Sequence, residues 1–286
     1  MNKRVCGKIS VEGDDLFYKI TGSGEPLLMI PGGGGDGDLY LPLADLLSQR
    51  FKVITYDRRA NSRSTMNDPT HFDIAQQARD AIAILNAASE KSACFFGNSS
   101  GAVIALEIAS TFPQSLKFGI VHEPPLAKIS PNKEKWMKFF DDCYKAAFKK
   151  GGASMASAKF LFGIEVPVMG MIGAQRKALK YLKDEPKDLD EKRIPSKDSN
   201  EFFIKQELIS VISYEPNIEN LKKVKDRLFI AAGDWSIKNN IWLAEVSKIL
   251  AKEIGCEFIS LPGHHGSFMD NPKEWTESLN KYLVRG

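Results

Sequence analysis

Residues 93–106 restrict the fold of this chain more than any other stretch. They begin with the short apolar run Ala93-Cys94-Phe95-Phe96, which fits one buried strand, and they end in apolar residues that fit a buried helix. Between these two parts lies the abrupt turn Gly97-Asn98-Ser99-Ser100-Gly101. A G-x-S-x-G turn between a strand and a helix strains the central serine and exposes its hydroxyl. The pattern therefore predicts a reactive Ser99, and an ordinary loop rich in glycine and serine is the competing interpretation.

The rest of the chain alternates between strand-like and helix-like segments in the same way. Runs typical of buried strands are 26–30, 51–57, 116–121, 227–234 and 257–261, and residues 8–20 alternate as a β-hairpin does. Helical patterns cover 39–50, 73–88, 239–254 and 272–284. This alternation predicts an α/β fold with a mostly parallel central sheet flanked by helices.

One long segment, 126–225, interrupts the alternation. It contains few strand signals and three helical stretches, at 133–149, 160–172 and 201–214, with a run of mixed charge at 177–198. We expect this segment to form a helical cap inserted into the fold. The predicted domains are therefore a core made of 1–125 and 226–286, and a cap at 126–225.

Charge and cysteine content exclude several classes of protein. The 286 residues carry a net charge of +3, which is too weak to favour nucleic acid or an anionic membrane as a partner. No window approaches the roughly 20 apolar residues of a membrane span, and the N-terminus has no apolar stretch of signal-peptide length. The four cysteines are scattered without a C-x-x-C pair, so neither a disulfide framework nor a zinc site is expected. We expect a cytoplasmic protein that takes a small-molecule substrate and uses no metal or cofactor.

Four consecutive glycines, Gly32 to Gly35, follow the predicted strand 26–30. Such a run lets the backbone approach another group closely. A phosphate-binding loop would need the pattern G-x-x-x-x-G-K-[ST], which is absent from this loop. A flexible loop and an anion-binding loop beside the serine remain as interpretations.

A serine, two acids and a histidine follow predicted strands in the order Ser99, Glu123, Asp234, His265. A serine hydroxyl is a poor nucleophile until a base such as histidine removes its proton. A carboxylate must then hold the imidazole in the right tautomer and stabilise its cation. Because ligands of parallel sheets bind outside the carboxyl ends of the strands, we expect these side chains to share one edge.

These segments together resemble the α/β-hydrolase family over nearly the whole chain. The turn 97–101 is similar to its nucleophile segment, and 56–64 to its D-x-R-G-x-G-x-S segment, with Ala60 and Ser62 in place of two glycines. Pro31-Gly32-Gly33 is similar to its His-Gly-X segment, with proline in place of histidine. The resemblance implies the fold of that family, with the central serine of the turn as nucleophile.

The end of the chain resembles the family's terminal G-H-x-x-x-x-x-x-P pattern. His265 and Pro272 have its spacing, and His264 stands in place of the glycine. The resemblance therefore implies His265 as the base in preference to His264. His71 and His122 are weaker candidates.

The resemblance also implies an oxyanion hole built from two backbone N–H groups. The N–H of Ser100 is one predicted donor, and the N–H of Gly33 is the other. Gly34 stays open as an alternative, because a run of four glycines does not fix which of them matches the donor position of the family.

Two residues compete for the role of the acid. Family members commonly carry it after the strand that follows the cap, in a G-x-x-D pattern, but here Ser236 holds that position and Asp234 lies two residues early. Other members carry it after the strand before the cap, where Glu123 stands. A turn or helix-capping role would explain Asp234 equally well, whereas a rigid carboxylate before Pro124-Pro125 has few structural uses. Glu123 is the predicted acid, and Asp234 is the alternate.

These residues predict a serine hydrolase that forms an acyl-enzyme with a small ester or related acyl substrate. A C–C bond hydrolase, a thioesterase, an amidase or a cofactor-free perhydrolase would use the same residues. A ligand-binding receptor without enzymatic activity is the alternative from another class, because a fold does not determine function. The sequence does not indicate an oligomeric state.

Overall fold

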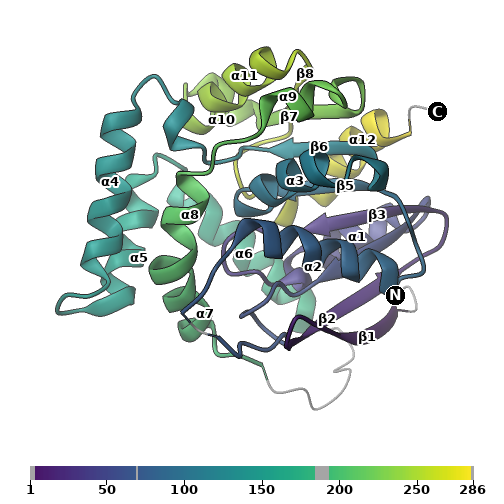
Figure 1. Ribbon diagram of the computed structural model, residues 1–286, viewed down its shortest axis with the longest axis horizontal. Coiled ribbons are helices and arrows are strands. Elements are labelled where there is room, and N and C mark those ends of the chain that lie inside the picture. Colours follow the sequence, from purple (N-terminus) through teal and green to yellow (C-terminus); the bar gives the residue numbers. More distant parts are fainter. Residues whose placement is uncertain (1–3, 69, 184–192, 285–286) are drawn as a thin grey trace.

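The computed structural model describes residues 4–68, 70–183 and 193–284 (Figure 1). At its centre lies an eight-stranded sheet with the strand order β1-β2-β4-β3-β5-β6-β7-β8. The strands are β1 Arg4–Val11, β2 Asp14–Thr21, β3 Glu25–Ile30, β4 Phe51–Tyr56, β5 Ala93–Asn98, β6 Leu116–His122, β7 Leu228–Gly233 and β8 Glu257–Leu261. The predicted hairpin is the antiparallel pair β1–β2.

The six neighbouring strands β4, β3, β5, β6, β7 and β8 pair in parallel. At one side of the sheet, β1 pairs with β2 and β2 with β4, and both of these pairs are antiparallel. β5 lies between β3 and β6, and all six of its residues are buried. Burial on both faces explains why this strand is a continuous apolar run rather than an alternating one. The arrangement confirms the predicted α/β fold with a mostly parallel sheet.

Helices cover both faces of the sheet. α2 (Ile74–Ala87), α3 (Ser100–Thr111) and α11 (Trp242–Ile254) share one hydrophobic core, and α1 (Leu41–Leu47) and α12 (Pro272–Leu283) contribute to the core on the other face. Asp73 caps the start of α2, because its carboxylate accepts the N–H groups of Ala75 and Gln76.

The chain between β6 and β7 is helical in its described residues. It contains α4 Lys133–Ala146, α5 Gly152–Gly163, α6 Val168–Lys183, α7 Ser196–Phe202, α8 Leu208–Ile212 and α9 Ile218–Lys222, and a π-helical turn Phe203–Glu207 joins α7 to α8. In Figure 1, α4 packs against α5 and α8 beside one end of the sheet. That this group acts as a cap stays a prediction.

One predicted helix in this segment was wrong. Residues 160–172 do not form one helix: Glu165 has a positive φ of 63°, and Pro167 disfavours a helical residue before it, so α5 ends and α6 begins within the stretch. The helix predicted at 201–214 is present up to Ile212 as the continuous run of α7, the π-helical turn and α8, and it begins earlier, at Ser196. Residues 184–192 of the mixed-charge run lie outside the described residues.

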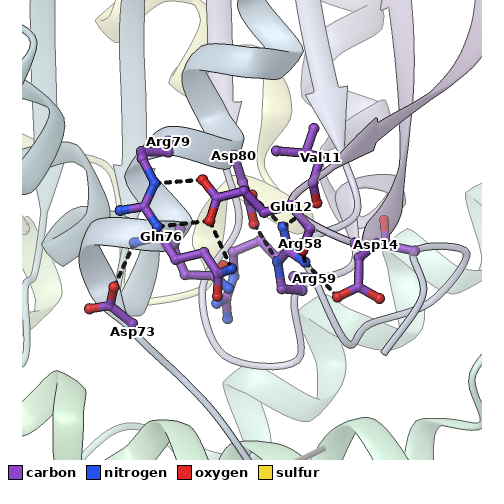
Figure 2. Close-up of polar contacts among 12 residues, drawn as sticks. Val11, Glu12, Asp14, Arg58, Arg59, Asp73, Gln76, Arg79 and Asp80 are labelled. Atoms are coloured by element: carbon purple, nitrogen blue, oxygen red, sulfur yellow. Dashed lines mark hydrogen bonds and ion pairs between the residues drawn. The ribbon is translucent and has the colours of Figure 1, made fainter. Parts of the chain in front are cut away.

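A cluster of arginines and acids fastens the first hairpin to α2 (Figure 2). Arg59 donates hydrogen bonds of 2.9 and 2.7 Å to Asp80 and one of 2.5 Å to Asp14. Nearer the solvent, two hydrogen bonds from Arg79 hold the pKa of Glu12 at about 2. These contacts join β2, the segment after β4 and α2, so they belong to the scaffold.

Within the described residues, no single helix is long and apolar enough to cross a membrane. The helices α5 and α6 reach the required length and composition only when they are taken together across a bend of 114°.

Candidate active site

Ser99 stands at the junction of β5 and α3 in a strained backbone conformation. Its φ of 57° and ψ of −124° lie in a region that residues other than glycine rarely adopt. Its N–H donates to the carbonyl of His122 at 3.0 Å. Gly101 lets the turn pack against β3, since a Cβ there would lie 2.1 Å from the carbonyl oxygen of Ile30. The turn has the geometry expected of G-x-S-x-G.

His265 and Glu123 form a hydrogen-bonded pair at the same edge of the sheet. Nδ1 of His265 lies 2.7 Å from Oε2 of Glu123. Glu123 follows β6 directly, is fully buried and has a φ of 49°, and His265 lies in the loop after β8 and is 8% exposed. Because the carboxylate accepts from Nδ1, the basic nitrogen of this imidazole is Nε2.

The Glu123 carboxylate is held on several sides. Its Oε1 accepts the N–H of Gly233 at 2.9 Å, and its own N–H donates to the carbonyl of Ala231 at 2.9 Å. Burial opposes its ionisation, but the positive charge that His122 carries at low pH and the hydrogen bond from His265 hold its pKa at about 2. Glu123 is therefore an oriented, ionised carboxylate at neutral pH.

His122 lies fully buried beside this pair. Nδ2 of Asn98 donates to Nδ1 of His122 at 2.8 Å and to the carbonyl of His265 at 3.1 Å. Since Nδ1 accepts, the proton of the neutral ring sits on Nε2, which lies 3.9 Å from Oε1 of Glu123, beyond hydrogen-bond distance. Burial lowers the pKa of His122 to about 4, so the ring stays neutral.

Asp234, the alternate acid, has a different environment. It is exposed and begins the short helix α10 (Asp234–Lys238), and its Oδ1 accepts the N–H of Gly263 at 2.7 Å. The residue thus ties the start of a helix to the loop after β8. The structure brings Glu123, not Asp234, to His265.

The other candidate histidines lie outside the pair as well. Nδ1 of His264 accepts the N–H of Gly266 at 3.2 Å, and burial lowers the pKa of this ring. His71 is exposed in the loop before α2. Neither ring takes part in the contact between His265 and Glu123.

The glycine loop passes directly beside the serine. A Cβ on Gly32 would lie 3.1 Å from Cβ of Ser99, and the N–H of Gly35 closes a turn on the carbonyl of Gly32 at 3.0 Å. Ser100 is the first residue of α3, so its N–H has no carbonyl one turn earlier to bind. The segments that carry the predicted donors Gly33 and Ser100 therefore both adjoin Ser99.

A cavity of about 710 Å³ contains these groups, since Ser99, His265 and Gly33 all line it. Its walls are largely apolar, and the aromatic lining comes from Phe140, Phe160, Phe203, Trp242 and Phe268, among others. The acidic and basic side chains on its lining, other than the imidazole of His265, are Asp36 and Arg193 in the described chain, and they lie 3.5 Å apart. Arg193 also binds Asp38 at 2.7 Å. The cavity thus offers an apolar chamber with reactive groups on its wall.

One group of described side chains has the spacing of a metal site, namely His122, Glu123 and His265. Nδ1 of His265 and Oε2 of Glu123 already bind each other, and Nδ1 of His122 accepts from Asn98, whereas the buried Nε2 of His122 has no hydrogen-bond partner among the described residues. The arrangement fits a hydrogen-bonded array better than a set of free ligands.

Two groups of contacts near Ser99 were not expected from the sequence: Asn98 binds His122 and the carbonyl of His265, and Arg58 binds Glu207 and the carbonyl of Gly32. Asn98 and Arg58 occupy variable positions of the two motifs that were recognised, so the motifs carried no signal for them. Glu207 lies in a helical stretch that also carries the charges of Glu201 and Lys205, so nothing local in the sequence marked it as the buried one.

Comparison with known proteins agrees with this fold. A family model described as alpha/beta hydrolase fold matches residues 25–200. The chain is 27% identical over 284 residues to the uncharacterized hydrolase YraK of Bacillus subtilis, covering 98% of this chain and 96% of YraK. It is 33% identical over 123 residues to a zearalenone hydrolase of Cladophialophora bantiana, covering 42% of this chain and 46% of that protein.

Solved structures show the same fold at low sequence identity. A hydrolase from Pseudomonas aeruginosa PA01 superposes with a TM-score of 0.72 at 17% identity, covering 98% of both chains. MGS-M2, an alpha/beta hydrolase from a deep-sea metagenome of the Medee basin, superposes with a TM-score of 0.73 at 18% identity, again over 98% of both chains.

Proposed function

The chain belongs to the alpha/beta hydrolase fold family, and from this premise we propose that it is a serine hydrolase acting on an uncharged, largely apolar ester or related acyl compound. The observation that carries the proposal is the buried hydrogen bond between His265 and Glu123 on the wall of a cavity that Ser99 also lines. A strained serine, an oriented imidazole and an ionised carboxylate form the set that nucleophilic acyl transfer requires.

In the proposed reaction, Oγ of Ser99 attacks the carbonyl carbon of the substrate while Nε2 of His265 takes the hydroxyl proton. Glu123 holds the proton on Nδ1 and stabilises the imidazolium. The alcohol then leaves with the proton from Nε2, and water cleaves the acyl-enzyme with His265 again as base. No hydrogen bond joins Ser99 to His265 among the described residues, so the serine side chain must turn toward Nε2 when substrate binds; such contacts are often longer without substrate.

The negative charge that develops on the carbonyl oxygen needs donors aimed at it before the reaction begins. We assign this role to the N–H groups of Ser100 and Gly33. The N–H of Ser100 belongs to the first residue of α3, and at the start of a helix the unpaired N–H groups and the helix dipole favour negative charge. Gly33 belongs to the loop that lies against Ser99.

The cavity supports the proposed substrate class. Its volume of about 710 Å³ lies within the usual range of about 300–1,000 Å³ for small-molecule pockets. Burying a charged substrate group against apolar walls would be costly without a partner. Among the described residues, the cation on its lining is Arg193, which is already paired with Asp36 and Asp38. The similarity to YraK and to the zearalenone hydrolase, both named as hydrolases, supports a hydrolytic reaction.

Hydrolysis of p-nitrophenyl acetate, butyrate and octanoate tests the proposal, with the mono-p-nitrophenyl ester of succinate measured separately as a charged substrate for comparison. We expect turnover that rises in kcat/KM from acetate to the longer neutral esters and is poorest for the succinate monoester. Ser99→Ala should lower kcat by at least about a thousandfold, as loss of a catalytic nucleophile does. Absence of turnover in folded wild-type protein would favour a ligand-binding role, and turnover by Ser99→Ala would contradict the mechanism.

A further inference from the structure

Arg58 has no part in the proposed chemistry, yet it is the central donor beneath the glycine loop. Its side chain is fully buried, and Nη2 donates to the carbonyl of Gly32 at 2.8 Å and to the Glu207 carboxylate at 2.7 and 2.9 Å. Nη1 donates to Gln77 at 3.2 Å, and the backbone N–H donates to the carbonyl of Gly35 at 2.8 Å. One residue thus binds both ends of the turn from Gly32 to Gly35.

The carbonyl that Arg58 binds belongs to the same peptide unit as the N–H of Gly33. In a planar trans peptide the C=O and N–H point in opposite directions. The carbonyl of Gly32 accepts from both Arg58 and Gly35, so its direction is set by two donors. Fixing that carbonyl also fixes the direction of the Gly33 N–H, which is the predicted oxyanion donor.

The partner of Arg58 comes from the helical segment between β6 and β7. Glu207 ends the π-helical turn that begins at Phe203, and its side chain is 1% exposed. The first residue of that turn reaches the same loop, because a Cβ on Gly33 would lie 2.7 Å from Cε2 of Phe203. Both ends of the π-helical turn therefore meet the glycine loop, directly or through Arg58. Such turns inside helices often occur at functional sites.

We propose that Arg58 and Glu207 are positioning residues for the oxyanion hole, and that their buried ion pair couples the helical segment to the peptide that carries the Gly33 N–H. This inference rests on the proposed function, because it concerns a donor used only in acyl transfer. Two physical arguments support it. Preorganised donors lose their value when they turn away from the developing charge. A guanidinium that loses its buried carboxylate must find another arrangement, because an unpaired buried charge is costly.

The neighbouring residue supplies a matched control. Arg59 is also a mostly buried arginine with two carboxylate partners, Asp14 and Asp80, but those partners tie the hairpin to α2 (Figure 2). Among the described residues, the hydrogen bonds of its side chain go to Asp14, Asp80 and the carbonyls of Val11 and Glu12, and none goes to the glycine loop. Loss of its fork geometry should therefore lower thermal stability without turning the peptide between Gly32 and Gly33.

The experiment compares Arg58→Lys, Glu207→Gln and Arg59→Lys by kcat and KM on p-nitrophenyl butyrate and by Tm. Lysine keeps the charge but lacks the rigid fork that reaches two acceptors. We expect kcat to fall about 10- to 100-fold in Arg58→Lys and about 3- to 10-fold in Glu207→Gln, with KM changed less than about threefold, as for partial loss of an oxyanion donor. Arg59→Lys should lower Tm and keep kcat within about twofold of wild type.

The outcomes separate the two proposals. If wild-type turnover depends on Ser99 but folded Arg58→Lys and Glu207→Gln keep wild-type kcat, or lose no more than Arg59→Lys, this inference is wrong and the proposed function stands. If Arg58→Lys fails to fold, Glu207→Gln decides by the same criterion. If the wild-type protein shows no turnover that depends on Ser99, the proposed function fails and this inference fails with it.

Discussion

Two neighbouring strands of the sheet, β6 and β7, each lead into a carboxylate, Glu123 and Asp234. Glu123 is fully buried with a positive φ, and both of its oxygens accept hydrogen bonds, one from Nδ1 of His265 and one from the N–H of Gly233. Asp234 is exposed at the start of a helix and accepts the N–H of Gly263. The two acids occupy similar places in the topology and very different environments.

The difference shows that the topology fixes the position of a carboxylate at the end of a parallel strand, whereas its burial decides what it can do there. In the low dielectric around Glu123, each hydrogen bond orients the group strongly. Water screens an exposed carboxylate and competes for its partners. The end of β6 can therefore hold an imidazole in one tautomer, whereas the end of β7 organises a loop.

The largest expected effect on activity is the loss of the carboxylate of Glu123. Glu123→Gln keeps the size of the side chain but removes the charge and turns an amide toward Nδ1 of His265. We expect kcat to fall by a thousandfold or more, because the imidazolium loses its partner and the wrong tautomer is favoured, as for amide replacement of a triad aspartate. Steady-state kinetics on a neutral p-nitrophenyl ester measures this loss. Activity within tenfold of wild type would remove Glu123 from the mechanism.

The second test concerns the buried character of the end of β6. Burial lowers the pKa of His122 from 6.5 to about 4, so the unfolded chain binds a proton that the folded chain refuses between these values. Stability should therefore be fully present above pH 6.5 and fall as the pH drops toward 4, by about 3 kcal/mol from this group.

The variant His122→Gln should lack that part of the fall, so its Tm should depend less on pH than that of the wild type between pH 6.5 and 4. Thermal unfolding followed by circular dichroism across this range checks the prediction. Parallel curves for the two proteins would show that His122 does not stay neutral in the folded state.

The smallest effect is expected at the end of β7. Asp234→Asn keeps an oxygen that can accept the N–H of Gly263, so the loop after β8 should hold its conformation. We expect kcat to fall by no more than about tenfold, a change of about 1.4 kcal/mol or less in the barrier. The same assay as for Glu123→Gln gives the comparison. A greater loss of kcat in Asp234→Asn than in Glu123→Gln would assign the role of the acid that orients His265 to Asp234 instead of Glu123.

The core of the fold could be predicted because its sequence patterns are local. Each strand of the parallel sheet is a short apolar run, and the backbone of the family-like segment 56–64 follows the pattern even where the side chains depart from it. Ala60 and Ser62 stand in place of two glycines, and both still have a positive φ, 68° and 48°. The strain at Ser99 was likewise encoded in five consecutive residues.

The contacts between distant segments could not be predicted in the same way. The sequence favoured Glu123 over Asp234 only through the rigid Pro124-Pro125 that follows it; the burial of Glu123 and its contact with the loop after β8 are reported by no local pattern. Arg58 meets Glu207 across 149 positions of sequence. The helical segment was also harder than the sheet, because its helix ends depend on Glu165, Pro167 and a π-helical turn rather than on periodicity.

Labelling with a fluorophosphonate tests the central claim most directly, because it asks for the nucleophile without a guessed substrate. Wild-type protein should gain the mass of one phosphonyl group, peptide mapping should place that group on Ser99, and esterase activity should be lost in step with labelling. Ser99→Ala should take up no label, and Glu123→Gln should react far more slowly than Asp234→Asn. Folded wild-type protein that stays unlabelled at Ser99, or that keeps its activity when fully labelled, would contradict the account.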